Sequence, residues 1–252
     1  MIKVTYARRV SQRDAADVGI PHYRVVMAAG GEDAAVLGCF LGPDGGPPLH
    51  VHDVDLLYYV VSGSALVRLG QGRHQAKAGD LIFIPAGLPH GSENHSAEDE
   101  HHLEVLLPGV LPGSPVLRPV KSVDDVPLPA ASAVVRSITN PPDATDAHSR
   151  SWLLAEGDAE IPCARVTAVE LAAQSPSRDT PERRQTERII VLTAGHLDVE
   201  IAGRRHSVEA EAVIVIPAEV EHRFWNSSAD LANILDIEVK ARSAFAKLAP
   251  KT

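Results

Sequence analysis

The sequence repeats itself at a fixed spacing, and this duplication limits the possible folds more than any other feature. LIFIPAGLPHGSEN at residues 81–94 matches VIVIPAEVEHRFWN at residues 213–226, a displacement of 132 positions. The same displacement relates the following pairs: Gly63 and Gly195, His74 and His206, Pro85 and Pro217, His90 and His222, Asn94 and Asn226, and Glu104 and Asp236. One unchanged displacement over so long a stretch indicates two copies of one structural unit.

Short hydrophobic runs bounded by glycine, proline and aspartate predict β-strands in both copies. Examples are YRVVMAA, AAVLGCFL, SALVRLG and GDLIFIPAG. Such runs are typical of an all-β domain, either a sandwich or a barrel. We therefore expect an all-β chain, and the clearest helix candidate is RSAFAKLA at residues 242–249.

The chain has 252 residues, which leaves room for two domains of about 125 residues each. We place the N-terminal domain at residues 1–108 and the C-terminal domain at residues 143–252. Residues 109–142 are rich in proline and polar turns and are predicted to be a linker. Within this linker, SAVVRSI is a candidate strand.

Composition excludes several classes of protein. The formal net charge is −9 and basic residues are scattered, so the basic stripe of a nucleic-acid-binding protein is absent. No apolar run reaches the roughly 18 residues of a membrane span, and the N-terminal residues lack a signal-peptide pattern. Cys39 and Cys163 are expected to be buried small hydrophobic residues. We expect a cytoplasmic protein that binds neither nucleic acid nor membrane.

Three histidines of the first copy form a candidate metal site. His50 and His52 are two positions apart, so on a strand both imidazoles point to the same face. His90 follows the strand and the Pro-Ala-Gly turn of GDLIFIPAGLPH. Three imidazoles from two strands would bind one divalent transition metal and leave positions for other ligands.

These segments resemble the two motifs of the cupin superfamily, and the whole chain resembles a bicupin. The second motif, G(X)5PXG(X)2H(X)3N, is met by Gly79, Pro85, Gly87, His90 and Asn94. The first motif, G(X)5HXH(X)3,4E(X)6G, is met by His50, His52 and Gly63, with Gly45 or Gly46 near its start. The resemblance implies one six-stranded jelly-roll barrel in each domain, with a metal inside. Family members use Fe, Mn, Ni, Zn or Cu.

The first copy departs from the family pattern at the glutamate ligand. Leu56, counted back from Gly63, occupies that position, so the expected ligand set is three neutral histidines. Asp55 is the alternative fourth ligand, although a regular strand would turn it to the opposite face. Tyr58 shares the inward face and is a candidate catalytic residue, or else a core aromatic. Glu104, on a later strand, is the second catalytic candidate.

The second copy has lost the corresponding histidines. The displacement assigns Glu182 to His50, Arg184 to His52, Arg188 to Leu56, and Glu211 and Glu219 to Gly79 and Gly87. Two cations and one carboxylate favour an internal ion pair over a metal ion. We therefore expect a structural role for the second barrel, and a pocket for anions at Arg184, Arg188 and His222 is the alternative.

Three classes of function follow from this centre. We favour a non-haem iron dioxygenase that acts on an enolisable dicarbonyl or aromatic compound, because neutral ligands leave positive charge for an anionic or chelating substrate. The alternative is a non-redox isomerase, cyclase, dehydratase or decarboxylase with Zn, Ni, Mn or Cu as its ion. The third hypothesis is a non-catalytic ligand-binding protein. By analogy with the family, we expect a homodimer.

Overall fold

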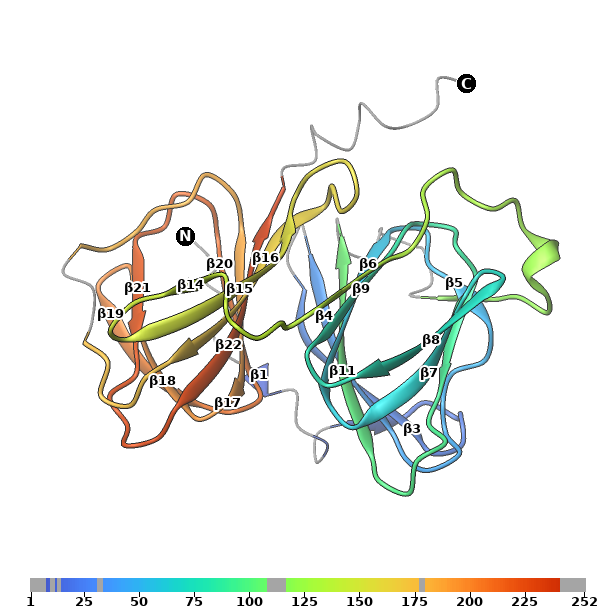
Figure 1. Cartoon of the computed structure of the whole chain (residues 1–252), viewed down its shortest axis with the longest axis horizontal. Coiled ribbons are helices and arrows are strands. Elements are labelled where there is room, and N and C mark those ends of the chain that lie inside the picture. The colour runs from blue at the N-terminus through green and yellow to red at the C-terminus, as the bar shows by residue number, and fades with distance from the viewer. Residues whose placement is uncertain are drawn as a thin grey trace. The chain divides into compact units, whose positions relative to one another are not determined.

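The computed structural model describes residues 8–9, 12, 15–30, 34–107, 117–176 and 180–240. The described residues form two compact units, one within residues 10–137 and the other made of residues 8–9 and 138–240 (Figure 1). The helix candidate at residues 242–249 lies outside the described residues.

The first unit has two antiparallel sheets. One has seven strands in the order β13-β9-β6-β11-β4-β3-β2, and the other has five in the order β12-β5-β10-β7-β8. The strands are β2 (Ala16–Asp17), β3 (Tyr23–Gly30), β4 (Ala35–Leu41), β5 (His50–Val51), β6 (Asp55–Ser62), β7 (Ser64–Leu69), β8 (Gly72–Lys77), β9 (Asp80–Ile84), β10 (His90–Glu93), β11 (Glu100–Leu107), β12 (Arg118–Pro119) and β13 (Val134–Ser137). A 3-10 turn, η1, covers Val123–Asp125.

The second unit repeats this plan. Its larger sheet has seven strands in the order β1-β20-β17-β22-β16-β15-β14, and its smaller sheet has the order β19-β18-β21. The strands are β1 (Arg8–Arg9), β14 (Ala144–Thr145), β15 (Ser149–Glu156), β16 (Ala164–Leu171), β17 (Arg188–Ala194), β18 (His196–Ile201), β19 (Arg204–Glu209), β20 (Ala212–Ile216), β21 (His222–Trp225) and β22 (Ala232–Val239). The prediction of an all-β chain with two tandem barrels is confirmed, and the described residues contain no α-helix.

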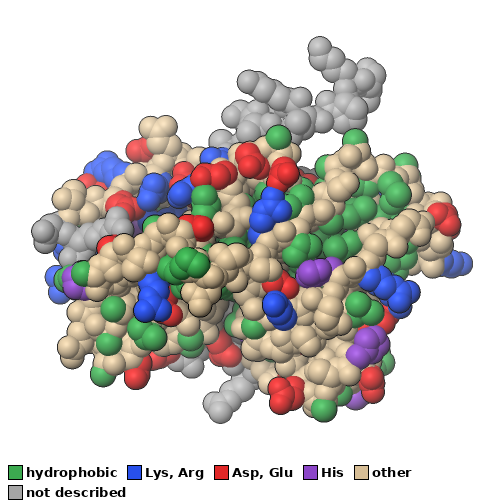
Figure 2. Space-filling model, in the orientation of Figure 1, with side chains coloured by type: hydrophobic (Ala, Val, Ile, Leu, Met, Phe, Trp, Pro, Cys, Tyr) green, Lys and Arg blue, Asp and Glu red, His purple; other side chains and the backbone are tan. Residues whose placement is uncertain are grey.

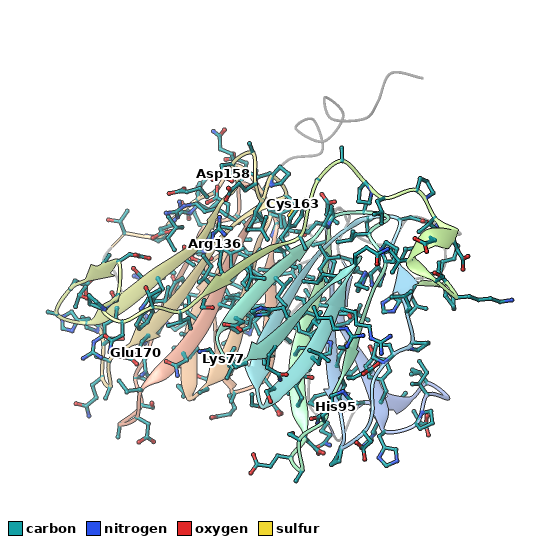
Figure 3. All side chains as sticks on the ribbon, turned by 45° about the vertical axis from the view of Figure 1, so that its right-hand side comes forward. Lys77, His95, Arg136, Asp158, Cys163 and Glu170 are labelled. Atoms are coloured by element: carbon teal, nitrogen blue, oxygen red, sulfur yellow. The ribbon has the colours of Figure 1, made fainter. Side chains whose placement is uncertain are left out.

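Each barrel is closed by a core of alternating side chains. In the first barrel Leu56, Tyr58 and Val60 of β6 point to the same interior as Ile82 and Ile84 of β9. A corresponding cluster fills the second barrel, with Ile190 and Leu192 of β17 and Ile214 and Ile216 of β20. Figure 3 shows the side chains gathered between the strands of each barrel. The period of two along each strand therefore decides which residues face the interior.

The strand before each repeat completes the larger sheet of the other repeat. β13 precedes the second repeat in the sequence and pairs with β9, through Val134 and Phe83 among other residues. β1 precedes the first repeat and pairs with β20, with Arg8 opposite Val213. β13 lies in the segment predicted to be a linker. Both sheets thus take an edge strand from outside their own repeat.

The turn that leads into His90 has the same backbone in both barrels. Gly87 has a φ of +78°, and its counterpart Glu219 has a φ of +62°. The amide of Gly87 donates to the carbonyl of His52 at 2.8 Å, and the amide of Glu219 donates to that of Arg184 at 2.7 Å. The hydrogen bond thus keeps a left-handed conformation that ordinarily favours glycine.

The surface has mixed charge on the face shown in Figure 2, where acidic and basic side chains are interspersed. Within the described part of the chain, no helix has the length and apolar character needed to cross a membrane.

Asn94 is the structural residue of the second motif, so its replacement should destabilise the first barrel. Its side chain is fully buried, and its amide donates to the carbonyls of Leu41 at 2.9 Å and Glu98 at 2.7 Å. We expect Asn94→Ala to lower the free energy of unfolding by about 2–3 kcal/mol, because two buried carbonyls lose their donor. Urea unfolding measures this change. His95→Ala is the control, since the His95 side chain is 60% exposed, and an equal loss in both variants would contradict the assignment.

Candidate metal centre

His50, His52 and His90 converge inside the first barrel. His50 lies on β5 opposite His90 at the start of β10, and His52 follows two positions later. Their exposed fractions are 2%, 2% and 3%, and one ligand atom of each lies within 4.8 Å of the others. The ring centroids are 4.4 Å apart for His50 and His90 and 5.0 Å apart for His52 and His90. The strand spacing thus brings together the three residues selected from the sequence.

Backbone carbonyls fix the orientation of two of these imidazoles. Nδ1 of His50 lies 2.7 Å from the carbonyl oxygen of Pro48, and Nδ1 of His90 lies 2.8 Å from that of Leu88. A carbonyl oxygen only accepts, so Nδ1 donates and Nε2 keeps its lone pair. Nε2 of His90 is buried and has no hydrogen-bond partner among the described residues. This donor arrangement fits a transition-metal ion, because ligating histidines use one nitrogen and donate through the other.

Burial keeps these imidazoles neutral. It lowers the pKa of His50, and it lowers that of His90 to about 3, with further lowering from His50 and His52. Only a neutral imidazole offers a lone pair to a metal ion, so both residues are in the ligating form at neutral pH.

The position of the missing glutamate is apolar, and Asp55 does not replace it. Leu56 is fully buried and lies between Ile84 of β9 and Leu106 of β11 in the sheet. Asp55 accepts a hydrogen bond from the amide of Ala86 at 2.9 Å, so its carboxylate stabilises the turn before His90. A role for Asp55 as fourth ligand therefore finds no support in its contacts.

A second buried cluster lies on β11 and its neighbours. Nδ1 of His102 is 2.8 Å from Glu100 Oε2, and its Nε2 is 3.7 Å from Glu104 Oε1. The Tyr58 hydroxyl donates to Glu100 at 3.2 Å, and the Tyr58 ring stacks on His102 with centroids 3.9 Å apart. Cys39 lies beside His102 and Glu104, with one ligand atom of each within 4.8 Å. We call Tyr58, Glu100, His102 and Glu104 the interior relay.

Electrostatics couple the interior relay to the three histidines. Burial alone would raise the pKa of Glu104, but the hydrogen bond from His102 and the nearby His52 and His50 lower it to about 2. Burial likewise opposes the charge of His102, and Glu100 raises its pKa well above the usual value. Burial raises the pKa of Cys39 to about 11, so its thiol stays protonated. An ionised Glu104 therefore faces the three-histidine centre from within the barrel.

Glu100 and His102 are absent from the sequence prediction, although Glu104 and Tyr58 are part of it. The signal was available, because Glu100, His102 and Glu104 alternate along one strand and so share one face. Cys39 was expected to be a small hydrophobic residue. It is buried, and it accepts a hydrogen bond from the Tyr23 hydroxyl at 3.3 Å.

The second barrel lacks the interior relay. The 132-residue displacement replaces Tyr58 by Ile190, Glu100 by Ala232 and His102 by Ile234, all of them core residues. Only the position of Glu104 stays acidic, as Asp236. The expected ion pair is present, since Glu182 Oε2 lies 2.8 Å from Arg184 Nη2 and 3.2 Å from Arg188 Nη1. The polar interior therefore accompanies the three-histidine centre and is absent from the other barrel.

The chain belongs to the cupin family. The Cupin domain family matches residues 39–106 and 169–238, which lie in the first and second barrels and together cover more than half of the chain. The protein is thus a two-domain cupin, as the motifs predicted.

Among proteins of known sequence, the uncharacterized protein SCO3923 of Streptomyces coelicolor is 37% identical over 57 residues. This match covers 23% of the present chain and 53% of the length of that protein.

Two solved bicupin-like structures have the same fold. A deletion mutant of Bacillus subtilis oxalate decarboxylase OxdC superposes with a TM-score of 0.74 at 14% identity, over 95% of this chain and 78% of that one. AerE from Microcystis aeruginosa gives a TM-score of 0.68 at 16% identity, over 90% of this chain and 96% of that one. At these identities the likeness establishes the fold alone.

Metal binding should depend on the first barrel only. We expect His90→Ala to remove nearly all bound metal, because it deletes one of three donors. His222→Ala, at the equivalent position of the second barrel, should leave the metal content unchanged. Elemental analysis of protein purified without chelators measures both, and equal losses would show that the second barrel also binds the ion.

Proposed function

We propose that the first barrel is the active centre of a metal-dependent enzyme acting on a small anionic or chelating molecule. The observation that carries this proposal is the convergence of three buried imidazoles, with the Nδ1 atoms of His50 and His90 bound to backbone carbonyls. His50, His52 and His90 would hold one divalent transition metal. When bound, the ion supplies Lewis acidity and a positive charge for an anionic substrate.

Glu104 is the residue that would move a proton at this centre. Its carboxylate is buried and electrostatically coupled to the histidines, and no carboxylate occupies the nearer position of Leu56. His102 lies between Glu104 and Glu100 and orients the first through its link to the second. Tyr58 acts as a positioning residue, because its hydroxyl donates to Glu100 while its ring holds the imidazole plane of His102.

A non-haem iron dioxygenase on an enolisable dicarbonyl or aromatic substrate is our first candidate. It is supported by the ligand set, since three neutral imidazoles without the family's glutamate leave the full charge of the ion to be balanced by an anionic substrate. Leu56 keeps that position apolar, which preserves this charge.

A non-redox isomerase, cyclase, dehydratase or decarboxylase is the second candidate. The interior relay favours it, because a buried carboxylate with an attached imidazolium is suited to general acid–base catalysis. The oxalate decarboxylase of Bacillus subtilis, described with Mn(II) centres, shares the fold with a TM-score of 0.72 at 14% identity. In this case Mn or Zn would replace iron.

Metal analysis combined with oxygen uptake separates the two candidates. Protein purified without chelators would be assayed for metals and then for oxygen consumption with enolisable and catecholic compounds. Iron with substrate-dependent oxygen uptake supports the dioxygenase. Manganese, zinc or nickel with turnover but no uptake supports the non-redox enzyme. A protein that binds no divalent metal, even when one is supplied, refutes the enzyme proposal as a whole.

Glu104→Gln should separate metal binding from catalysis. The amide is similar in size but cannot take up a proton, so we expect turnover to fall by about 100-fold or more while metal content is retained. Glu93→Gln is the matched control, because the Glu93 side chain is 37% exposed and paired with Arg68 at the surface. Loss of metal from Glu104→Gln would instead identify Glu104 as a ligand.

A further inference from the structure

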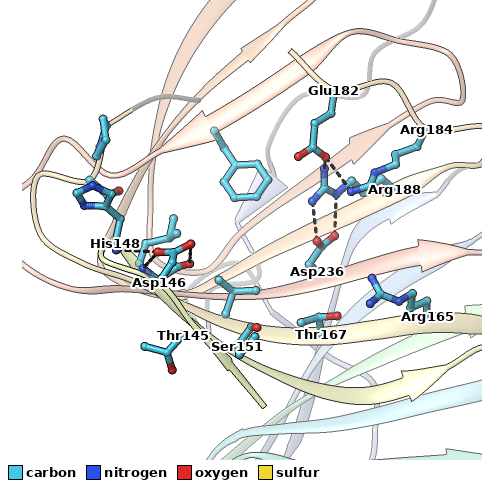
Figure 4. Close-up of a pocket in the computed structure, with 17 residues that line it drawn as sticks. Thr145, Asp146, His148, Ser151, Arg165, Thr167, Glu182, Arg184, Arg188 and Asp236 are labelled. Atoms are coloured by element: carbon cyan, nitrogen blue, oxygen red, sulfur yellow. Dashed lines mark hydrogen bonds and ion pairs between the residues drawn. The ribbon is translucent and has the colours of Figure 1, made fainter. Parts of the chain in front are cut away.

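The second barrel holds a buried guanidinium where the first barrel has its histidine cluster. Arg188 opens β17, and its side chain is only 4% exposed. Its Nε and Nη2 donate to the two carboxylate oxygens of Asp236 at 2.7 and 2.6 Å. Its Nη1 lies 3.2 Å from Glu182 Oε2 and 2.7 Å from His222 Nε2. Figure 4 shows the guanidinium between the carboxylates of Glu182 and Asp236.

The groups around this guanidinium occupy the positions of the first centre. Glu182 pairs with His222 across an antiparallel bridge, as His50 pairs with His90. Nδ1 of His222 lies 2.9 Å from the carbonyl of Val220, which leaves Nε2 as an acceptor. The backbone therefore presents a lone pair of His222 in the way that it presents one of His90. In the second barrel this lone pair meets a proton of Arg188.

We propose that Arg188 is the resident cation of the second barrel, and that Glu182, Asp236 and His222 form a divalent-metal site that this guanidinium blocks. Without Arg188, two carboxylates and one imidazole would face the interior with no cation, at a large cost in desolvation. A divalent ion neutralises two carboxylates, whereas the guanidinium neutralises one. The ligand chemistry suits Mn²⁺, Co²⁺ or Zn²⁺, which accept oxygen and imidazole ligands.

A cavity in the same barrel gives such an ion a route to the site. It has a volume of about 480 Å³, and its lining includes Arg188, Glu182 and Asp236 beside the ring of Phe224. Ser151 and Thr167 add hydroxyl groups along β15 and β16 (Figure 4). A metal ion is smaller than a guanidinium, so both carboxylates must move inward when it binds, and water from the cavity can complete the coordination sphere.

The test replaces Arg188 in a protein whose first centre is disabled. The variant His90→Ala/Arg188→Leu uses leucine because Leu56 holds the equivalent position of the first barrel. Co²⁺ is the probe, followed by calorimetry and by its visible absorption. We expect the double variant to bind about one Co²⁺ per chain beyond the His90→Ala background. Adding His222→Ala should weaken this binding by about 10-fold or more.

Matched variants keep the result decisive. Arg188→Lys retains a cation and should bind no additional Co²⁺, whereas Arg188→Gln removes the charge with less loss of volume and should bind as the leucine variant does. A variant that folds only when Co²⁺ is present also supports the proposal. Binding no greater than background in both uncharged variants overturns it, as does equal binding by the lysine variant. Because the first centre is disabled throughout, these outcomes are independent of what the first barrel binds.

Discussion

Convergent lone pairs in a barrel interior need a cation, and both halves of this chain are arranged around that requirement. The antiparallel pairing that sets residue 50 opposite residue 90 recurs as the bridge between Glu182 and His222. The carbonyls of Leu88 and Val220 then direct Nε2 of His90 and His222 inward. The same backbone thus presents donors in both barrels. In the second barrel a guanidinium satisfies them, and in the first we propose a metal ion.

The two barrels balance their charge differently. In the first, the three converging donors are neutral and the negative charge lies deeper, on Glu104 beside His102. In the second, the carboxylates of Glu182 and Asp236 contact the cation directly, and the deeper positions are Ile190 and Ile234. Duplication followed by divergence has therefore separated a barrel with a polar interior from one whose charges pair among themselves.

The fold could be predicted because its determinants are local and repeated. Alternating apolar residues, turn residues and one constant displacement specify strands and their duplication. The grouping of His50, His52 and His90 followed from the two-residue period and the motif. The interior relay was only half predicted, since a stacking contact between Tyr58 and His102 joins strands that are distant in sequence. The turn contact of Asp55 with Ala86 likewise depends on tertiary structure.

The exchanged edge strands bear on how the protein can be divided. A fragment ending before β13 would leave β9 with an unpaired edge, and removal of β1 would do the same to β20. Exposed strand edges readily pair with other chains, so such fragments would tend to aggregate although each retains a whole repeat. The unit of independent folding is thus not the unit of duplication. The gene boundaries of the ancestral barrel and the boundaries of a well-behaved fragment are offset by one strand.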